Sequence, residues 1–196
     1  MKKLVLGAAM LLFAQFSFGQ AVNDNAIIPV SVTLNSILRL TVVSGGNIEF
    51  VVNTIDDYTS GINTGGTDVR YHTIFTVSSS QDFDVTLRSE EDDLLGQDNT
   101  VNVLDGANVG YDLTGGAGED GTNWDLPATI EGLSATPVTV VSGIAANAAG
   151  DAVQNRFVIQ WRLGTQEGNM VKTSLLAQSN PADRYVTNVF LELSSK

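Results

Sequence analysis

The stretch that decides the fold runs from Tyr71 to Ser89 and is YHTIFTVSSSQDFDVTLRS. It contains two runs in which every second side chain suits a protein core, which is the period of a β-strand with one buried face. The expected inward-facing residues are Tyr71, Thr73, Phe75 and Val77 in the first run and Phe83, Val85 and Leu87 in the second. The polar tetrapeptide SSSQ between the runs predicts a turn, so we expect the two strands to pair as a hairpin.

The same alternation recurs along most of the chain. Strong runs cover residues 28–34, 48–52, 157–163 and 185–193, and weaker ones cover 38–43, 101–104, 109–113 and 137–142. The segments between them are rich in residues that favour turns, and the single candidate helix, at 144–153, is interrupted by Gly150. The pattern predicts an all-β protein built as a single antiparallel β-sandwich of about 8 to 10 strands with little helix. A β-barrel of similar strand number is the alternative.

The N-terminus has the features of a secretory signal peptide. Two lysines precede an apolar run from Leu4 to Phe13, and the small residues Ser17 and Gly19 mark a cleavage site before Gln20. The apolar run is too short to span a bilayer, which takes about 20 residues. We expect residues 1–19 to be removed and residues 20–196 to form one domain whose first part, 20–34, is an N-terminal strand or arm. A small residue followed by Gln at the cleavage site is similar to signals of the Bacteroidota.

Composition excludes several kinds of partner and chemistry. The chain has 22 acidic and 10 basic residues, and loss of Lys2 and Lys3 with the signal changes its net charge from −12 to −14. Such a charge repels nucleic acid and anionic membrane surfaces, so we expect neither as a partner and no insertion into a membrane. The chain has no cysteine and one histidine, His72, which disfavours zinc sites and hydrolase triads. We expect no enzymatic activity.

Two acidic segments raise the question of calcium binding. The first, Asp105 to Asp125, contains GGAGED, which fits one copy of a calcium-binding nonapeptide, but no second repeat follows it. The carboxylates that could form a looser calcium site are Asp112, Glu119, Asp120 and Asp125. The interpretation we favour is a solvated acidic loop, and therefore a protein that needs no cofactor. The second segment, SEEDDLLGQD at 89–98, is interpreted as a charged loop at a sheet end.

Trp124 is the best candidate for a ligand-binding side chain. It lies in the Gly- and Asp-rich loop next to Asn123 and Asp125, and an indole in such a loop can stack on the face of a sugar. The competing interpretation is that Trp124 packs over one end of the sandwich. Trp161 is in phase with Phe157 and is expected in the core.

The order of three segments resembles the secreted immunoglobulin-like sandwiches of bacterial fimbrial and spore-coat-U type subunits. These segments are IIPVSVTLNSILRLTVVSGGNIEF at 27–50, the stretch quoted first, and the closing PADRYVTNVFLELSSK at 181–196. In those families the last strand often starts with Gly-x-Tyr, whereas here Asp183 replaces the glycine, and the disulfide common in enteric members is absent. The resemblance implies a structural or adhesive subunit.

Two functions therefore remain open. The first is an exported subunit, in the periplasm, at the cell surface or outside the cell, that assembles with copies of itself or with other surface subunits. Its assembly strand would be the arm, in which Ile28, Val30, Val32 and Leu34 alternate with other residues at period two and could be donated to a neighbour. The second is a secreted calcium- or glycan-binding module that uses Trp124 and the acidic loop.

Cleavage after Gly19 is the first testable expectation. The exported protein should start at Gln20, because Ser17 and Gly19 are the small residues that the signal peptidase accepts. Intact-mass spectrometry of the exported chain checks this, and a species that retains residues 1–19 would contradict the signal-peptide interpretation.

Overall fold

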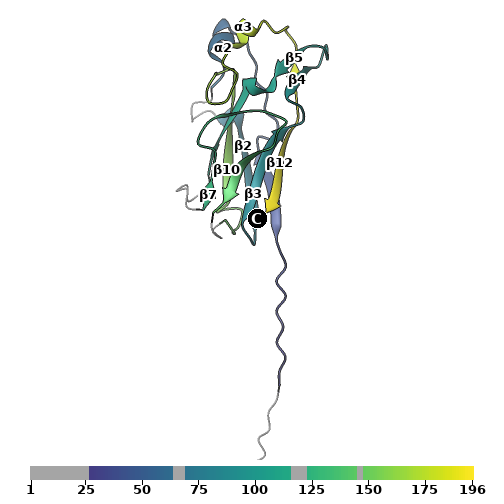
Figure 1. The fold of residues 1–196 in the computed structure, drawn as a ribbon, viewed down its shortest axis with the longest axis vertical. Helices are drawn as coiled ribbons and strands as arrows, with labels where there is room; N and C mark the ends of the chain where they lie inside the picture. The colour runs from purple at the N-terminus through teal and green to yellow at the C-terminus, as the bar shows by residue number, and fades with distance from the viewer. Residues whose placement is uncertain (1–26, 64–68, 116–122, 145–147) are drawn as a thin grey trace, which may run out of the picture. The chain divides into compact units, whose positions relative to one another are not determined.

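The structure, a computed structural model, describes residues 27–63, 69–115, 123–144 and 148–196 (Figure 1). The chain separates into two units, residues 1–34 and residues 35–196. The predicted signal peptide at 1–19 lies outside the described residues. Within the second unit, strands predominate and every strand pair is antiparallel, which confirms the prediction of an all-β fold.

The described strands form three sheets. The five-stranded sheet has the order β1 (Leu38–Ser44), β2 (His72–Ser79), β10 (Arg156–Leu163), β6 (Val109–Thr114) and β8 (Glu131–Gly132). The four-stranded sheet has the order β12 (Val189–Ser195), β3 (Phe83–Ser89), β9 (Val138–Gly143) and β7 (Trp124–Asp125). The three-stranded sheet has the order β11 (Tyr185–Val186), β4 (Asp93–Gly96) and β5 (Val103–Asp105).

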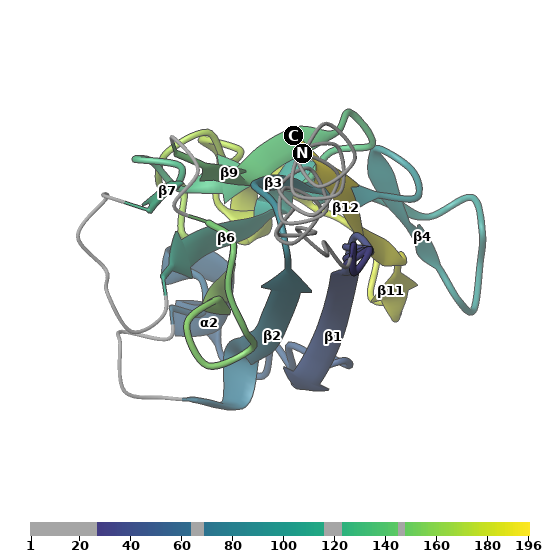
Figure 2. The same cartoon turned by 90° about the horizontal axis from the view of Figure 1, so that it is seen from below.

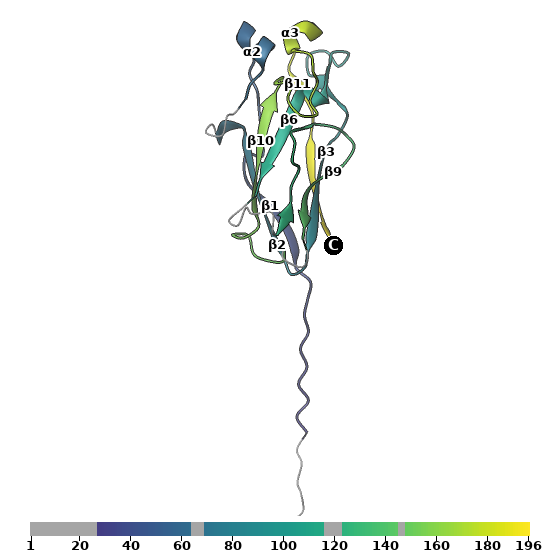
Figure 3. The ribbon, with the colours of Figure 1, turned by 60° about the vertical axis from the view of Figure 1, so that its left-hand side comes forward.

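Short helical elements lie between the strands. They are α2 (Ile55–Ser60), α3 (Leu175–Gln178) and the 3₁₀ turns η2 (Val69–Tyr71) and η3 (Gly106–Asn108). The helix α2 begins with a capping box, in which Thr54 and Asp57 each accept a hydrogen bond from the other's backbone N–H. Figures 1 and 3 place α2 and α3 side by side at one end of the sandwich.

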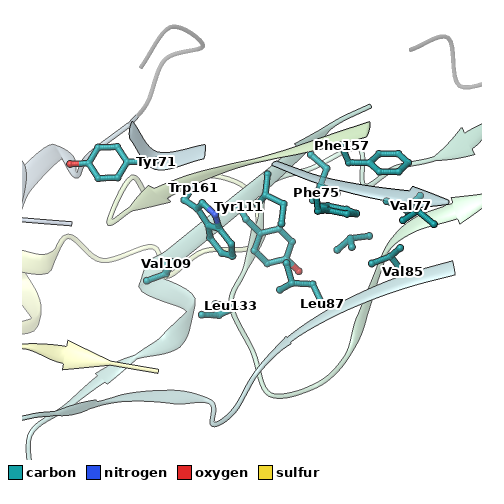
Figure 4. Packing of buried hydrophobic residues seen from close by; sticks show 14 of the residues in the cluster. Tyr71, Phe75, Val77, Val85, Leu87, Val109, Tyr111, Leu133, Phe157 and Trp161 are labelled. Carbon is teal, nitrogen blue, oxygen red and sulfur yellow. The ribbon is translucent and has the colours of Figure 1, made fainter. Parts of the chain in front are cut away.

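The five-stranded and four-stranded sheets face each other and enclose the core (Figure 2). Its centre is aromatic: Phe157 of β10 stacks on Phe75 at a centroid distance of 5.2 Å and meets the edges of Phe83 and Trp124 at 6.5 and 5.5 Å. Figure 4 shows Phe157 beside Phe75, and it shows Phe75 and Val77 from one sheet opposite Val85 and Leu87 from the other. The two runs of the stretch 71–89 thus supply both walls of the core.

The predicted hairpin between these two runs is wrong. Strand β2 pairs with β1 and β10, whereas β3 pairs with β12 and β9, so the connection at residues 80–82 crosses from one sheet to the other. The backbone of Ser79 instead exchanges hydrogen bonds with Gly150. The period of two identifies the buried face of a strand but not its partner, because strands that face each other across a core show the same pattern as strands that are paired.

The structure also differs from the sequence pattern at three other segments. The acidic segment 89–98 is not only a loop, since it contains β4, whose Leu94 lies opposite Leu104 of β5 and is buried with it. The described part of the candidate helix 144–153 contains no helix; residues 145–147 lie outside the described residues. The run 48–52 forms no strand, although its apolar side chains Ile48, Phe50 and Val52 pack against the core.

Phe157 should be the most sensitive position of the core. Its replacement by alanine removes the ring that joins Phe75, Phe83 and Trp124, and such truncations cost about 3 to 5 kcal/mol of unfolding free energy. Urea unfolding of the chain from Gln20, followed by tryptophan fluorescence, measures the loss. Val153→Ala, at a side chain that is 72% exposed, is the control and should change stability by less than about 0.5 kcal/mol. A loss below about 1 kcal/mol in Phe157→Ala would contradict the assigned packing.

Candidate functional site

The apolar residues predicted to form an assembly strand are exposed. Residues 27–34 belong to no strand in the structure. The exposed fractions are 81% for Ile28, 84% for Val30, 79% for Val32 and 89% for Leu34. Monomeric soluble proteins rarely expose four large apolar side chains in one segment, and such a segment often marks an interaction site. We call residues 28–34 the arm.

The second feature is a pair of sheet edges that lie on the same side of the sandwich. Strand β1 ends the five-stranded sheet and β12 ends the four-stranded sheet, and Figure 2 shows both at one side of the stacked sheets. Residues directly opposite each other in antiparallel strands share a face of the sheet. Leu40 lies opposite buried Val77, so Leu40 faces inward, and Leu191 faces inward opposite buried Leu87. By the same register the inward-facing residues are Leu38, Leu40 and Val42 on β1 and Val189, Leu191 and Leu193 on β12.

These six residues, which we call the β1/β12 seam, face the core but are not fully covered. Leu38, Val42 and Val189 remain 38%, 45% and 39% exposed. Leu40, Leu191 and Leu193 are half-buried and pack against the core cluster. An inward-facing aliphatic residue of a sandwich is normally buried by the opposite sheet, so the described part of the chain covers the core incompletely at the seam.

The opposite side of the sandwich is closed by contrast. There the edges are β7 and β8, and Trp124 of β7 is only 4% exposed with its ring against Phe157. Leu133, the residue that follows β8, is 2% exposed. The two sides therefore differ in how completely the apolar side chains at their edges are covered.

Part of the chain that follows β1 covers more of the core without forming a strand. This part comprises residues 45–53. Its Phe50 ring stacks on the Tyr71 ring at a centroid distance of 4.5 Å. Ile48 and Val52 are half-buried against the core cluster. The alternation in this run therefore correctly marks which side chains pack inward, although no neighbouring strand pairs with its backbone.

The carboxylates predicted as a loose calcium site are not brought together where the structure describes them. Asp112 of β6 lies 3.7 Å from the guanidinium of Arg162. Asp125 is exposed on β7, where it pairs with Ser142. Glu119 and Asp120 lie outside the described residues. Among the residues that the structure does describe, no group of three acidic or histidine side chains could hold a metal ion.

Trp124, the predicted ligand-binding residue, has its side chain inside the sandwich. Its ring meets Phe157 edge to face, and its indole N–H is buried without a hydrogen-bond partner. A ring in this position has no free face for a sugar. The geometry matches the competing interpretation, in which Trp124 packs over the core.

Asp183 makes a set of contacts that the sequence did not reveal. Its carboxylate accepts hydrogen bonds from the backbone N–H groups of Asp98, Asn99 and Arg184, at 2.9, 3.2 and 2.7 Å, and from the Asn102 side chain at 2.9 Å. The N–H of Asp98 and the amide of Asn102 hold the pKa of this carboxyl at about 2. Asp183 thereby ties the loop between β4 and β5 to the segment before β11.

No protein-family model matches this chain, and no curated protein matches it significantly. Within the described residues, no helix is long and apolar enough to cross a membrane.

Calcium should not stabilise this protein. A ligand that binds only the folded state at 100 times its Kd adds about 2.7 kcal/mol, which raises the melting midpoint by several degrees. Asp112 is engaged by Arg162 and Asp125 lies on a different sheet, so we expect equal midpoints in excess calcium and in chelator. Differential scanning calorimetry checks this. A rise that Asp120→Ala abolishes and the control Glu91→Ala preserves would show that the acidic loop binds calcium.

Proposed function

We propose that this protein is an exported structural or adhesive β-sandwich subunit that assembles at the cell surface or into an extracellular filament by donating its N-terminal arm. The observation that carries the proposal is the arm itself. Its four apolar side chains have the spacing of a strand with one buried face, yet they are 79 to 89% exposed. A segment of this kind gains free energy when an unpaired sheet edge accepts it, because the added strand forms backbone hydrogen bonds and buries its apolar face.

The composition of the arm supports this role. Residues 28–34 contain no charged side chain, although the chain as a whole carries 22 acidic residues. Two copies with the same negative charge repel each other, so a contact between them is most favourable where neither surface brings a carboxylate. The arm meets this condition.

Apolar burial offsets most of the cost of ordering the arm. Burial of a valine, leucine or isoleucine side chain contributes about 1.5 to 3 kcal/mol, so four such side chains supply about 6 to 12 kcal/mol. Ordering the backbone costs about 1 to 2 kcal/mol per residue, and the backbone hydrogen bonds of an added strand contribute the remainder. Among the described residues, no strand pairs with the outer edge of β1 or of β12, so either edge could receive a strand.

The N-terminal sequence supports export. The lysines, the apolar run and the small residues at 17 and 19 form a signal peptide pattern, and cleavage after Gly19 leaves eight residues before Ile28. Cleavage would therefore place the arm close to the new N-terminus, where a strand is free to leave its own chain.

The double substitution Val30→Asp and Val32→Asp should abolish assembly and leave the sandwich folded. Each carboxylate would have to be buried in the acceptor, and the loss of two apolar contacts alone weakens association by roughly 3 kcal/mol, or at least a hundredfold. Size-exclusion chromatography and negative-stain microscopy report assembly, and circular dichroism reports the fold.

The matched control is Ser31→Asp with Thr33→Asp, which adds the same charge to the alternate positions of the arm. This control should still assemble, because its carboxylates point away from the buried face. Loss of the β signal in the Val30/Val32 variant would instead show that the arm is an ordinary strand of its own domain. A wild-type chain from Gln20 that remains monomeric would overturn the proposed function.

A further inference from the structure

We propose that the outer face of the three-stranded sheet, formed by β11, β4 and β5, binds a basic protein segment that also carries aliphatic side chains. The inference goes beyond the proposed function, because it assigns a second binding surface in which the arm takes no part. The sheet lies at the end of the sandwich that carries α2 and α3 (Figures 1 and 3). All of its residues belong to the unit 35–196.

The centre of this face is a row of three aliphatic side chains, one from each strand. Val186 of β11 lies opposite Leu95 of β4, and Leu95 lies opposite Val103 of β5. Residues directly opposite each other in antiparallel strands share a face, so the three side chains are neighbours. Val186, Leu95 and Val103 are 39%, 41% and 45% exposed. We call them the aliphatic row.

The aliphatic row does not belong to the core of the sandwich. The neighbouring residues Leu94 and Leu104 lie opposite each other on the inner face of the sheet, and both are buried. The sheet therefore already covers the core with one face, while the described part of the chain leaves the row on its other face partly open. Adjoining aliphatic side chains that stay exposed often mark an interaction site.

Two carboxylates border the row on the same face. Asp93 lies opposite Asp105, and each is two residues from a member of the row, so both side chains point outward. The Cβ atoms of such opposed residues lie about 4.5 to 5.5 Å apart, and like charges there destabilise a sheet. Within the described residues, neither carboxylate forms a salt bridge. A cationic group bound between Asp93 and Asp105 would relieve their repulsion.

The row and the carboxylates together fit a lysine or arginine side chain of a partner. The aliphatic stem of such a side chain covers apolar surface while its charged end reaches a carboxylate. A calcium ion fits less well, because it takes roughly six to eight oxygen ligands. No group of three acidic or histidine side chains that could hold a metal ion occurs in the described part of the chain.

The charge around the row favours a basic partner over a second copy of this chain. The stretch 89–105, which contains β4 and β5, has six acidic residues and no basic one. A second copy that used the same face would bring the same carboxylates and be repelled. A basic segment is attracted to this face, and the aliphatic side chains beside its charges can pack on the row.

Binding of a synthetic peptide tests this surface. The probe is a fluorescently labelled peptide of sequence KLKLKLK, and its anisotropy is followed as the chain from Gln20 is added at physiological ionic strength. We expect saturable binding with a Kd below about 1 mM. The peptide KSKSKSK has the same charge but no aliphatic side chain, so it should bind roughly tenfold more weakly or less.

The double variant Asp93→Asn with Leu95→Ser should weaken binding of KLKLKLK roughly tenfold or more, because it removes one carboxylate and one member of the row. The matched control is Asp151→Asn with Val153→Ser, which makes the same two changes at the same spacing in an exposed loop. This control should bind the peptide as the wild type does.

Circular dichroism checks that the variants fold. If the first variant loses its β signal, Val103→Ser with Asp105→Asn replaces it. Asparagine at position 105 keeps a side-chain oxygen for the hydrogen bond that Asp105 Oδ1 accepts from the Ala107 N–H at 2.8 Å.

The other outcomes each overturn the inference. Absence of saturable binding, or equal affinity of the wild type and the Asp93/Leu95 variant, would exclude this face as the site. Equal binding of KSKSKSK and KLKLKLK would show that charge alone attracts the peptide. Self-association of the wild type that the Asp93/Leu95 variant loses, seen by sedimentation velocity, would show that the occupant is a second copy. Peptide binding does not depend on filament formation, so a failure of the proposed function would leave this inference standing.

Discussion

A β-sandwich must cover its core along the two sides where its sheets end, and this constraint shapes the whole domain. Inside each sheet, neighbouring strands shield one another, but at an edge only large side chains or an additional strand can exclude water. On one side the indole of Trp124 and the side chain of Leu133 fill this role. On the other side β1 and β12 direct only Leu and Val inward, and three of these six residues remain more than a third exposed.

The sequence predicted the class of fold because apolar residues recur at every second position wherever one face of a strand is buried. Phe75, Val77, Phe83 and Val85 were assigned inward by this period, and all four are buried. The pairing of strands could not be derived in the same way. Strands β2 and β3 have the patterns expected of a hairpin, yet they lie in opposite sheets, because alternation does not distinguish a neighbour across the core from a neighbour in the same sheet.

The candidate site was only half visible in the sequence for the same reason. The arm stands out as an apolar, uncharged run in an acidic chain, whereas the seam consists of Val and Leu residues that are indistinguishable from core residues until the sheet order is known. Asp183 was equally hidden, since its partners Asp98 and Asn102 are more than 80 residues away in sequence. Trp124 was ambiguous because its neighbours in sequence are polar, while the residue that covers it, Phe157, is distant in the chain.

Charge repulsion between copies and burial of the apolar arm affect assembly over different distances. Repulsion between two copies with net charge −12 is screened beyond about 8 Å at physiological ionic strength. Burial of apolar side chains acts only at contact, so salt lowers the barrier to encounter but leaves the contact itself largely unchanged. In the proposed assembly, strand addition would bury the apolar side chains of the arm, which are 79 to 89% exposed in a single copy.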